Sequence, residues 1–134
     1  MVLNKKRIFI IEDDAYNLGI ITSLLTQHGA VVDFDGWGIA TIDRIRKFMP
    51  IDLILLDLML PQNISGYDIF DKIRARDELK DVPVIIVSAS DPDVEMRKAR
   101  KKGCAGFIRK PLRFNTFAKQ IVSVLNGENI WGDE

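Results

Sequence analysis

The chain has 134 residues, of which 47% are hydrophobic and 28% are charged, and its 19 basic and 19 acidic residues cancel. A chain of this length can bury a core unaided, and its composition argues against a disordered chain or a strongly basic nucleic-acid binder. The single cysteine, Cys104, cannot form an internal disulfide and belongs to no zinc or redox motif. No apolar run is long enough for a membrane span or a signal peptide, so we expect a cytoplasmic protein.

Short segments rich in β-branched residues predict strands. In chain order they are residues 7–11, 30–34, 52–56, 84–87 and 106–108. The first, third and fourth segments are continuously apolar, which is typical of strands buried on both faces of a parallel sheet.

Longer stretches with helical spacing of apolar residues separate these strands. The first predicted helix spans residues 15–28 and the second spans residues 39–48. The third begins after Gly66. A fourth has Asp91 as its cap and Pro92 as its first residue, but it carries few apolar side chains and should be the least firmly anchored. A fifth is expected to begin at Pro111, with a stripe formed by Phe114, Phe117, Ile121 and Leu125.

The alternation of strand and helix predicts a doubly wound α/β fold with a five-stranded parallel sheet and helices on both faces. We expect one domain over residues 1–126 and a short C-terminal tail over residues 127–134, in which Trp131 packs back onto the domain. In such sheets functional groups gather at the carboxyl ends of the strands. The residues that follow the strands are therefore candidates for a single site.

Acidic, ammonium and hydroxyl groups follow four of the five strands: Glu12, Asp13 and Asp14, then Asp57, Ser88 and Lys110. Clustered carboxylates repel one another unless a cation neutralises them, and oxygen ligands without His or Cys favour Mg²⁺. A lysine and a hydroxyl are suited to phosphoryl oxygens. The set predicts a site for a phosphoryl group.

Four motifs resemble the signature of response-regulator receiver domains: Ile11-Glu12-Asp13-Asp14, the run LLDLMLP at residues 55–61, Val87-Ser88-Ala89 and Arg109-Lys110-Pro111. They occur in the family's order and spacing, and the resemblance covers essentially the whole chain. It implies the flavodoxin-like strand order 2-1-3-4-5, which the residues alone do not fix.

The resemblance also implies the roles of the site residues. Asp57 would accept a phosphoryl group from a sensor histidine kinase or a phosphotransfer protein. Mg²⁺ would sit on Asp13, Asp57 and the backbone carbonyl of Met59, with Glu12 in the outer acidic position and Asp14 outside the set. Lys110 would pair with the phosphoryl group, Ser88 would be drawn toward it, and Phe107 would rotate inward as the second switch residue.

Three departures from the common family pattern bear on behaviour. The loop from Pro61 to Gly66 is one residue longer, and Phe107 replaces a frequent tyrosine, so inward burial lacks a phenolic hydrogen bond. Met59 and Ser90 occupy the positions that tune phosphoryl lifetime. Because Met59 offers no help to an attacking water, we expect slow hydrolysis.

Between Met96 and Gly127 the chain holds nine basic residues and no acidic one: Arg97, Lys98, Arg100, Lys101, Lys102, Arg109, Lys110, Arg113 and Lys119. This asymmetry fits a solvated helix face, or a docking surface for an acidic partner or a second copy of the chain. Nucleic acid is the weakest interpretation, because no helix-turn-helix follows.

We therefore predict a stand-alone receiver of a two-component phosphorelay, a switch that acts on a downstream protein through its fourth helix, fifth strand and fifth helix. It would not be an ordinary enzyme. One alternative is an adaptor that binds its partner without phosphorylation. Another is a small phosphatase with an aspartyl nucleophile, although Met59 stands where the usual second catalytic aspartate would be.

Overall fold

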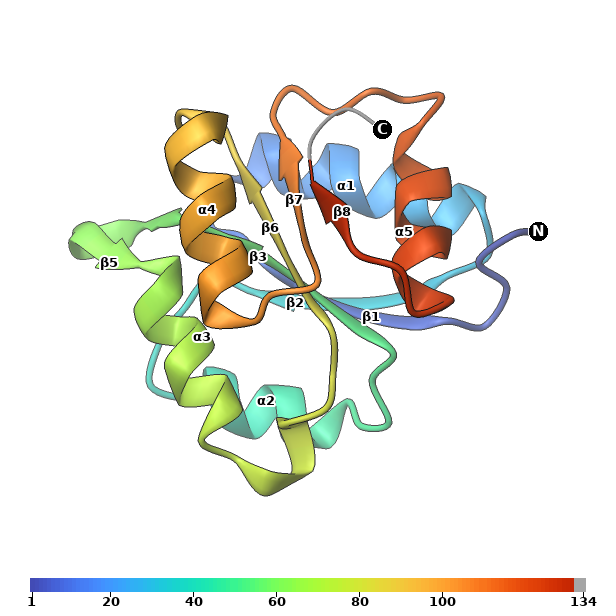
Figure 1. Cartoon of the computed structure of the whole chain (residues 1–134). Helices are drawn as coiled ribbons and strands as arrows, with labels where there is room; N and C mark the ends of the chain where they lie inside the picture. Colours follow the sequence, from blue (N-terminus) through green and yellow to red (C-terminus); the bar gives the residue numbers. More distant parts are fainter. Residues whose placement is uncertain (132–134) are drawn as a thin grey trace.

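The computed structural model describes residues 1–131, which form a twisted parallel sheet covered by helices on both faces (Figure 1). The described part of the main sheet has the order β2-β1-β3-β6-β7-β8, and all its pairings are parallel. Its strands are β1 (Arg7–Ile11), β2 (Val31–Asp35), β3 (Leu53–Asp57), β6 (Val84–Ser88), β7 (Gly106–Arg109) and β8 (Ile130–Trp131). The first five, counted along the chain, have the expected order 2-1-3-4-5, and β8 adds a short strand at the edge.

The described helices are α1 (Ala15–Gln27), α2 (Thr41–Lys47), α3 (Gly66–Arg74), α4 (Pro92–Lys102) and α5 (Phe117–Leu125). Alternate strand residues point to opposite faces of the sheet and divide the core into two clusters. Phe9 and Ile11 of β1 belong to the cluster with residues of α2, α3 and α4, while Ile8 and Ile10 join α1 and α5. The predicted doubly wound α/β architecture is confirmed.

Two predicted helices begin later than expected. α5 begins at Phe117 instead of Pro111, and Phe114 lies outside it with 65% of its surface exposed. The preceding residues form a turn in which the Thr116 and Phe117 N–H groups both donate to the Arg113 carbonyl. Asn and Thr side chains favour helix caps over helix interiors, so Asn115 and Thr116 favour a helix that begins after them. The prediction of a helix from Pro111 was wrong by six residues.

The helix α2 begins at Thr41 rather than Ile39, whose side chain is fully exposed. The buried Thr41 hydroxyl donates to Asp35 at 2.7 Å and accepts from the Gly38 N–H at 2.8 Å. These bonds tie the start of α2 to the end of β2, and they leave Ile39 in the preceding loop.

The longer loop after β3 forms a small hairpin, in which β4 (Met59–Leu60) pairs antiparallel with β5 (Ile64–Ser65). Gln62 and Asn63 adopt the left-handed backbone region with φ of 62° and 57°. The hairpin returns the chain to Gly66, where an added Cβ would lie 2.5 Å from the Asp57 carbonyl oxygen. Only glycine allows α3 to begin this close to the end of β3.

The helix α4 has the predicted start, since the Asp91 side chain accepts from the Asp93 N–H and Pro92 is the first residue. Ala99 is the residue of α4 that is fully buried. Met96 packs partly against the core, and polar contacts join α4 to α3: the Tyr67 hydroxyl donates to Glu95 Oε2 at 2.7 Å, and Lys102 Nζ lies 3.1 Å from Asp71.

The described part of the C-terminal tail ends in β8, which pairs with β7. The remaining tail residues, 132–134, lie outside the described residues. Within residues 1–131, no helix combines the length and apolar character needed to cross a bilayer. Cys104 is free and buried, and burial raises the pKa of its thiol to about 11, so the thiol stays protonated at neutral pH.

Candidate functional site

The carboxyl ends of β1, β3, β6 and β7 bring the predicted residues into one site. Glu12, Asp13 and Asp57 each present a carboxylate oxygen, and these three oxygens lie within 4.8 Å of one another. A shallow hollow beside them is lined by Asp57, Met59, Ser88, Ala89, Ser90 and Lys110. Residues far apart in the sequence therefore meet where the fold predicts.

Lys110 is the ammonium of this cluster. Its Nζ lies 2.8 Å from Glu12 Oε1 and 3.5 Å from Asp57 Oδ1, and its backbone N–H donates to the Ser88 carbonyl at 2.8 Å. Three carboxylates against one ammonium leave two formal negative charges in a site where Glu12 and Asp57 are buried and Asp13 is exposed. Two excess charges on oxygen ligands match a hard divalent cation.

The pKa of Asp57 is raised from 3.8 to about 7. Burial is the largest cause, and the hydrogen bond and charge of Glu12 raise it further. Lys110 and the Met59 N–H, which donates to Asp57 Oδ1 at 3.4 Å, act in the opposite direction. The protein alone therefore does not fully neutralise this pair of acids, and a cation placed among the carboxylates would favour their ionised form.

Glu12 is held in place by its own loop. One of its oxygens accepts from the Asp13 N–H at 3.1 Å and from the Asp14 N–H at 3.4 Å. Asp14 has a different structural role, because its side chain caps α1 by accepting from the Asn17 N–H. The residues 12–14 thus divide between the acidic cluster and the start of α1.

The remaining predicted residues surround the cluster at different depths. The Ser88 hydroxyl is buried and accepts from the Ser90 N–H at 3.0 Å. Met59 is 71% exposed at the rim. Phe107 is fully buried in the core cluster that faces α4.

Two glycines were missed by the sequence analysis as parts of this site. Gly66 abuts the Asp57 backbone, and a Cβ on Gly36 would lie 3.3 Å from the Asp13 Cβ. Both glycines matter because of contacts with segments that are distant in sequence. The glycines themselves give no sign of these contacts in the sequence.

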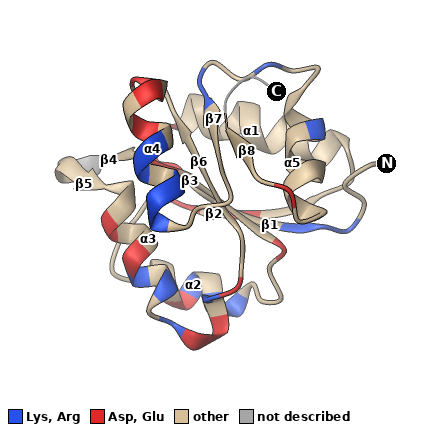
Figure 2. Cartoon of the chain, in the orientation of Figure 1, with Lys and Arg blue, Asp and Glu red and all other residues tan. Residues whose placement is uncertain are grey.

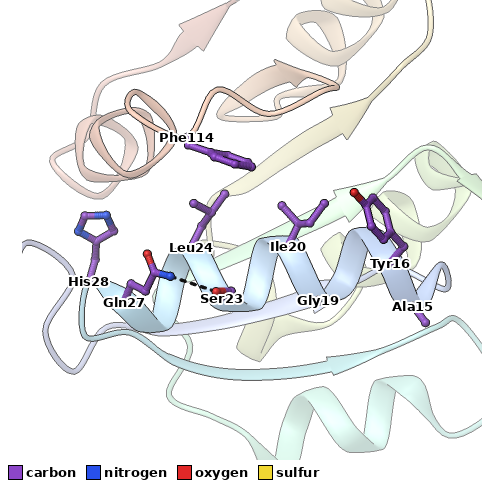
Figure 3. Close-up of a pocket in the computed structure, with 9 residues that line it drawn as sticks. All are labelled: Ala15, Tyr16, Gly19, Ile20, Ser23, Leu24, Gln27, His28 and Phe114. Atoms are coloured by element: carbon purple, nitrogen blue, oxygen red, sulfur yellow. Dashed lines mark hydrogen bonds between the residues drawn. The ribbon is translucent and has the colours of Figure 1, made fainter.

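An apolar groove of about 600 Å³ lies along α1, with Phe114 opposite the helix (Figure 3). Tyr16 and Phe114 are 76% and 65% exposed. A second hollow shares Tyr16, Ile20 and Phe114 with this groove and is also lined by Lys110. The exposed apolar surface therefore extends to Lys110, and sequence analysis missed it because Phe114 was assigned to a helix.

A family model for the response regulator receiver domain matches residues 8–122. The polar-differentiation response regulator DivK of Brucella anthropi is 32% identical over 120 residues, which covers 90% of this chain and 96% of that protein.

Solved structures show the same fold. The receiver domain of a sensor histidine kinase from Pseudomonas aeruginosa PAO1, with a magnesium ion coordinated in its active-site cleft, is 25% identical with a TM-score of 0.77, covering 92% of this chain and 99% of that one. A LuxR-family two-component response regulator from Aurantimonas is 20% identical with a TM-score of 0.80, covering 95% of this chain and 89% of that one. From the family match and the DivK relative together, the chain belongs to the response regulator receiver domain family.

Proposed function

We propose that this receiver accepts a phosphoryl group on Asp57 and thereby switches a protein-binding surface formed by α4, β7 and α5. One observation carries the proposal: Lys110 Nζ bridges Glu12 and Asp57 at the edge of a hollow that Ser88 also lines. A nucleophilic carboxylate, a point charge and a hydroxyl donor around one space are the groups that phosphoryl transfer needs.

The acidic cluster fits Mg²⁺. Glu12, Asp13 and Asp57 supply oxygen ligands and an excess of negative charge, and we propose that the backbone carbonyl of Met59 completes the protein's contribution. When bound, the ion would neutralise charge on the transferred phosphoryl oxygens. The magnesium ion in the active-site cleft of the Pseudomonas aeruginosa receiver domain supports this assignment.

In the transfer step, an Asp57 carboxylate oxygen attacks the phosphorus of a phosphohistidine. The phosphorus–oxygen bond forms as the phosphorus–nitrogen bond breaks, and the electron pair of that bond returns to the imidazole nitrogen of the donor. Lys110 would move from Glu12 toward the new phosphoryl oxygens, and the Ser88 hydroxyl would donate to another. Positioning and charge neutralisation suffice, so no dedicated base is required.

We propose that the phosphorylated site acts on α4 and β7. Ser88 ends β6 and is in register with Arg109 of β7, while Lys110 follows directly. Movement of Ser88 and Lys110 toward a phosphoryl group would pull on both strand ends and on the loop that leads into α4. Phe107, two residues before Arg109 on β7, is the second switch residue in this proposal.

The groove between α1 and Phe114 is the proposed contact for the phosphoryl donor, a sensor histidine kinase or phosphotransfer protein. It adjoins Lys110, so a protein seated there would have its own residues next to Asp57. The downstream partner would use the other side, where the exposed Arg97, Lys98 and Lys101 give the later turns of α4 a basic surface (Figure 2). That charge favours an acidic partner surface.

The proposed receiver stores a phosphoryl group and does not turn over a substrate, apart from slow self-phosphorylation by small donors and slow self-dephosphorylation. Met59 is apolar and exposed at the rim, and it can neither activate nor orient a water molecule. We therefore expect a long-lived aspartyl phosphate. A lifetime of only seconds, measured by loss of the phosphoryl mass after removal of the donor, would contradict this part.

Intact mass after incubation with Mg²⁺ and acetyl phosphate tests the proposal, with Asp57→Asn as the matched control. One phosphoryl increment in the wild type, absent from the control and from a sample with EDTA, is the expected result. Absence of the increment in the wild type would overturn the proposal and favour an adaptor that binds without phosphorylation.

A further inference from the structure

The tail strand β8 closes the edge of the sheet next to β7, on the side of α5 (Figure 1). Its residues Ile130 and Trp131 are in register with Gly106 and Phe107 of β7, and the Ile130 N–H donates to the Ala105 carbonyl at 3.2 Å. An uncovered edge strand offers free backbone groups to another chain. Here the chain's own tail occupies that edge over two residues of β7.

The two side chains of β8 join opposite halves of the core. Ile130 is 4% exposed and belongs to the cluster that contains Phe117 and Ile121 of α5. Trp131 packs against the other cluster, which contains Phe107. The tail therefore contacts the apolar core on both faces of the sheet beside β7.

Gly106 is shaped to this tail. A Cβ at position 106 would lie 2.5 Å from Ile130 Cγ1 and 2.8 Å from the Ile130 carbonyl oxygen. All three of the nearest atoms that such a Cβ would meet belong to Ile130. The glycine thus makes room for β8 to approach, which indicates a fitted contact rather than a chance position of the chain end.

The tail also holds α4. The Arg100 guanidinium carbon lies 4.7 Å from the centre of the Trp131 ring, within the range of a cation–π contact. Because Ala99 is the fully buried residue of α4, side contacts contribute much of what fixes this helix. Trp131 supplies one of them from the tail, beside the Tyr67–Glu95 and Lys102–Asp71 contacts from α3.

We infer that residues 127–131 form a latch that holds α4 and masks the edge of β7 until Asp57 is phosphorylated. In this arrangement Ser88 and Lys110 are engaged by the chain's own groups: the Ser88 hydroxyl accepts from the Ser90 N–H, and Lys110 Nζ binds Glu12. A phosphoryl group on Asp57 competes for both side chains. The resulting shift of α4 breaks the Arg100–Trp131 contact, and β8 leaves the edge of the sheet.

The latch rests on the proposed function, and thermodynamic linkage gives it a second consequence. If phosphorylation disfavours docking of β8 by a given factor, docking of β8 must disfavour phosphorylation by the same factor, so variants that weaken docking should favour the phosphorylated arrangement. Docking of the tail and phosphorylation of Asp57 therefore disfavour each other, although β8 does not touch Asp57.

Hydrogen exchange of the full-length chain tests release directly. With Mg²⁺ and acetyl phosphate, the C-terminal amides, including that of Ile130, should exchange at least about threefold faster than without the donor. Asp57→Asn should show no change. The intact mass of the same samples separates the two claims: no phosphoryl increment would overturn the proposed function and the coupling with it, whereas an increment with unchanged exchange would overturn the latch alone.

Variants that weaken the latch test the reverse direction. Gly106→Ala drives a methyl group into Ile130, and Trp131→Ala removes the aromatic contact if the first variant fails to fold. Each should raise C-terminal exchange without any donor and raise the ratio of phosphorylated to unphosphorylated chain at equilibrium with acetyl phosphate and acetate about two- to fivefold. Arg100→Gln should act in the same direction, with Arg76→Gln, at an exposed arginine outside the proposed binding surface, as its control. Wild-type equilibrium ratios in all three latch variants would overturn the proposal.

Discussion

The helices α3 and α4 lie side by side over the same face of the sheet but are fixed by different interactions. α3 buries Ile69, Phe70 and Ile73, whereas α4 fully buries only Ala99, packs the partly buried Met96 against the core and is otherwise joined through polar and aromatic side contacts. Apolar burial stabilises in proportion to area, so displacing α3 would cost several kcal/mol, while the contacts of α4 can be exchanged at about 1 kcal/mol each. The chain therefore keeps one helix as a fixed wall and leaves its neighbour free to respond.

The largest expected effect comes from shortening a buried apolar side chain of α3. Ile73→Ala should lower the free energy of unfolding by about 2–5 kcal/mol, because the side chain is fully buried and a cavity remains. Val94→Ala on α4 is the matched change, and with 42% of that side chain exposed it should cost less than about 1 kcal/mol. Urea denaturation followed by circular dichroism measures both. Equal losses would show that the two helices are anchored alike.

The acidic cluster next to the start of α3 contains carboxylates that repel one another. The pKa of Asp57 rises from 3.8 in the unfolded chain to about 7 in the folded one. Protonation therefore favours the fold: this stabilisation is complete below about pH 4 and is lost as the pH rises through about 7. Without Mg²⁺, Asp57→Asn should exceed the wild type in stability at pH 8 by an amount on the order of 2–4 kcal/mol, and by less at pH 5.

Denaturation at the two pH values, with EDTA present, measures this difference. Mg²⁺ should narrow it at pH 8 by neutralising the carboxylates. Asp13→Asn is the control at the exposed member of the cluster and should change the pH dependence less. A difference between Asp57→Asn and the wild type that stays constant from pH 5 to pH 8 would contradict the raised pKa.

The parts of the molecule that could be predicted from the sequence are those whose signals are local or follow from the fold. The central strands were predicted to within about a residue, because continuous apolar runs, ended by Asp57 or Ser88, leave little freedom in where a strand stops. The meeting of Glu12, Asp57 and Lys110 followed from the fold rule for strand ends. The start of α4 was predicted because Asp91 and Pro92 act locally.

The errors arose where a pattern depends on what lies opposite. Ile39 and Phe114 continue the helical spacing of apolar residues, yet the structure leaves both exposed and outside the helices. β8 has only two residues, too few for a periodic signal. The roles of Gly66 and Gly106 depend on atoms of Asp57 and Ile130, which are distant or unpredictable partners in the sequence.

A smaller effect is expected from loosening α4 at its side. Tyr67→Phe removes the hydroxyl that donates to Glu95 and should cost about 0.5–1.5 kcal/mol in global stability. The amide hydrogens of α4 should exchange faster while those of α3 stay protected, because the ring remains in place. Uniform acceleration over both helices would show that this hydrogen bond does not act on α4 selectively.

The smallest expected effect lies on the opposite face of the sheet, at Phe114. Because 65% of this side chain is exposed outside any helix, Phe114→Ala should change stability by less than about 0.5 kcal/mol, whereas Phe117→Ala, at a position 1% exposed, should cost about 3–5 kcal/mol. Acetyl phosphate needs no docking surface, so Phe114→Ala should be labelled at the wild-type rate. Transfer from a phosphorylated histidine kinase should slow instead, since the groove that Phe114 lines adjoins Lys110. Equal slowing with both donors would place Phe114 in the chemistry of the site and not in recognition of the donor.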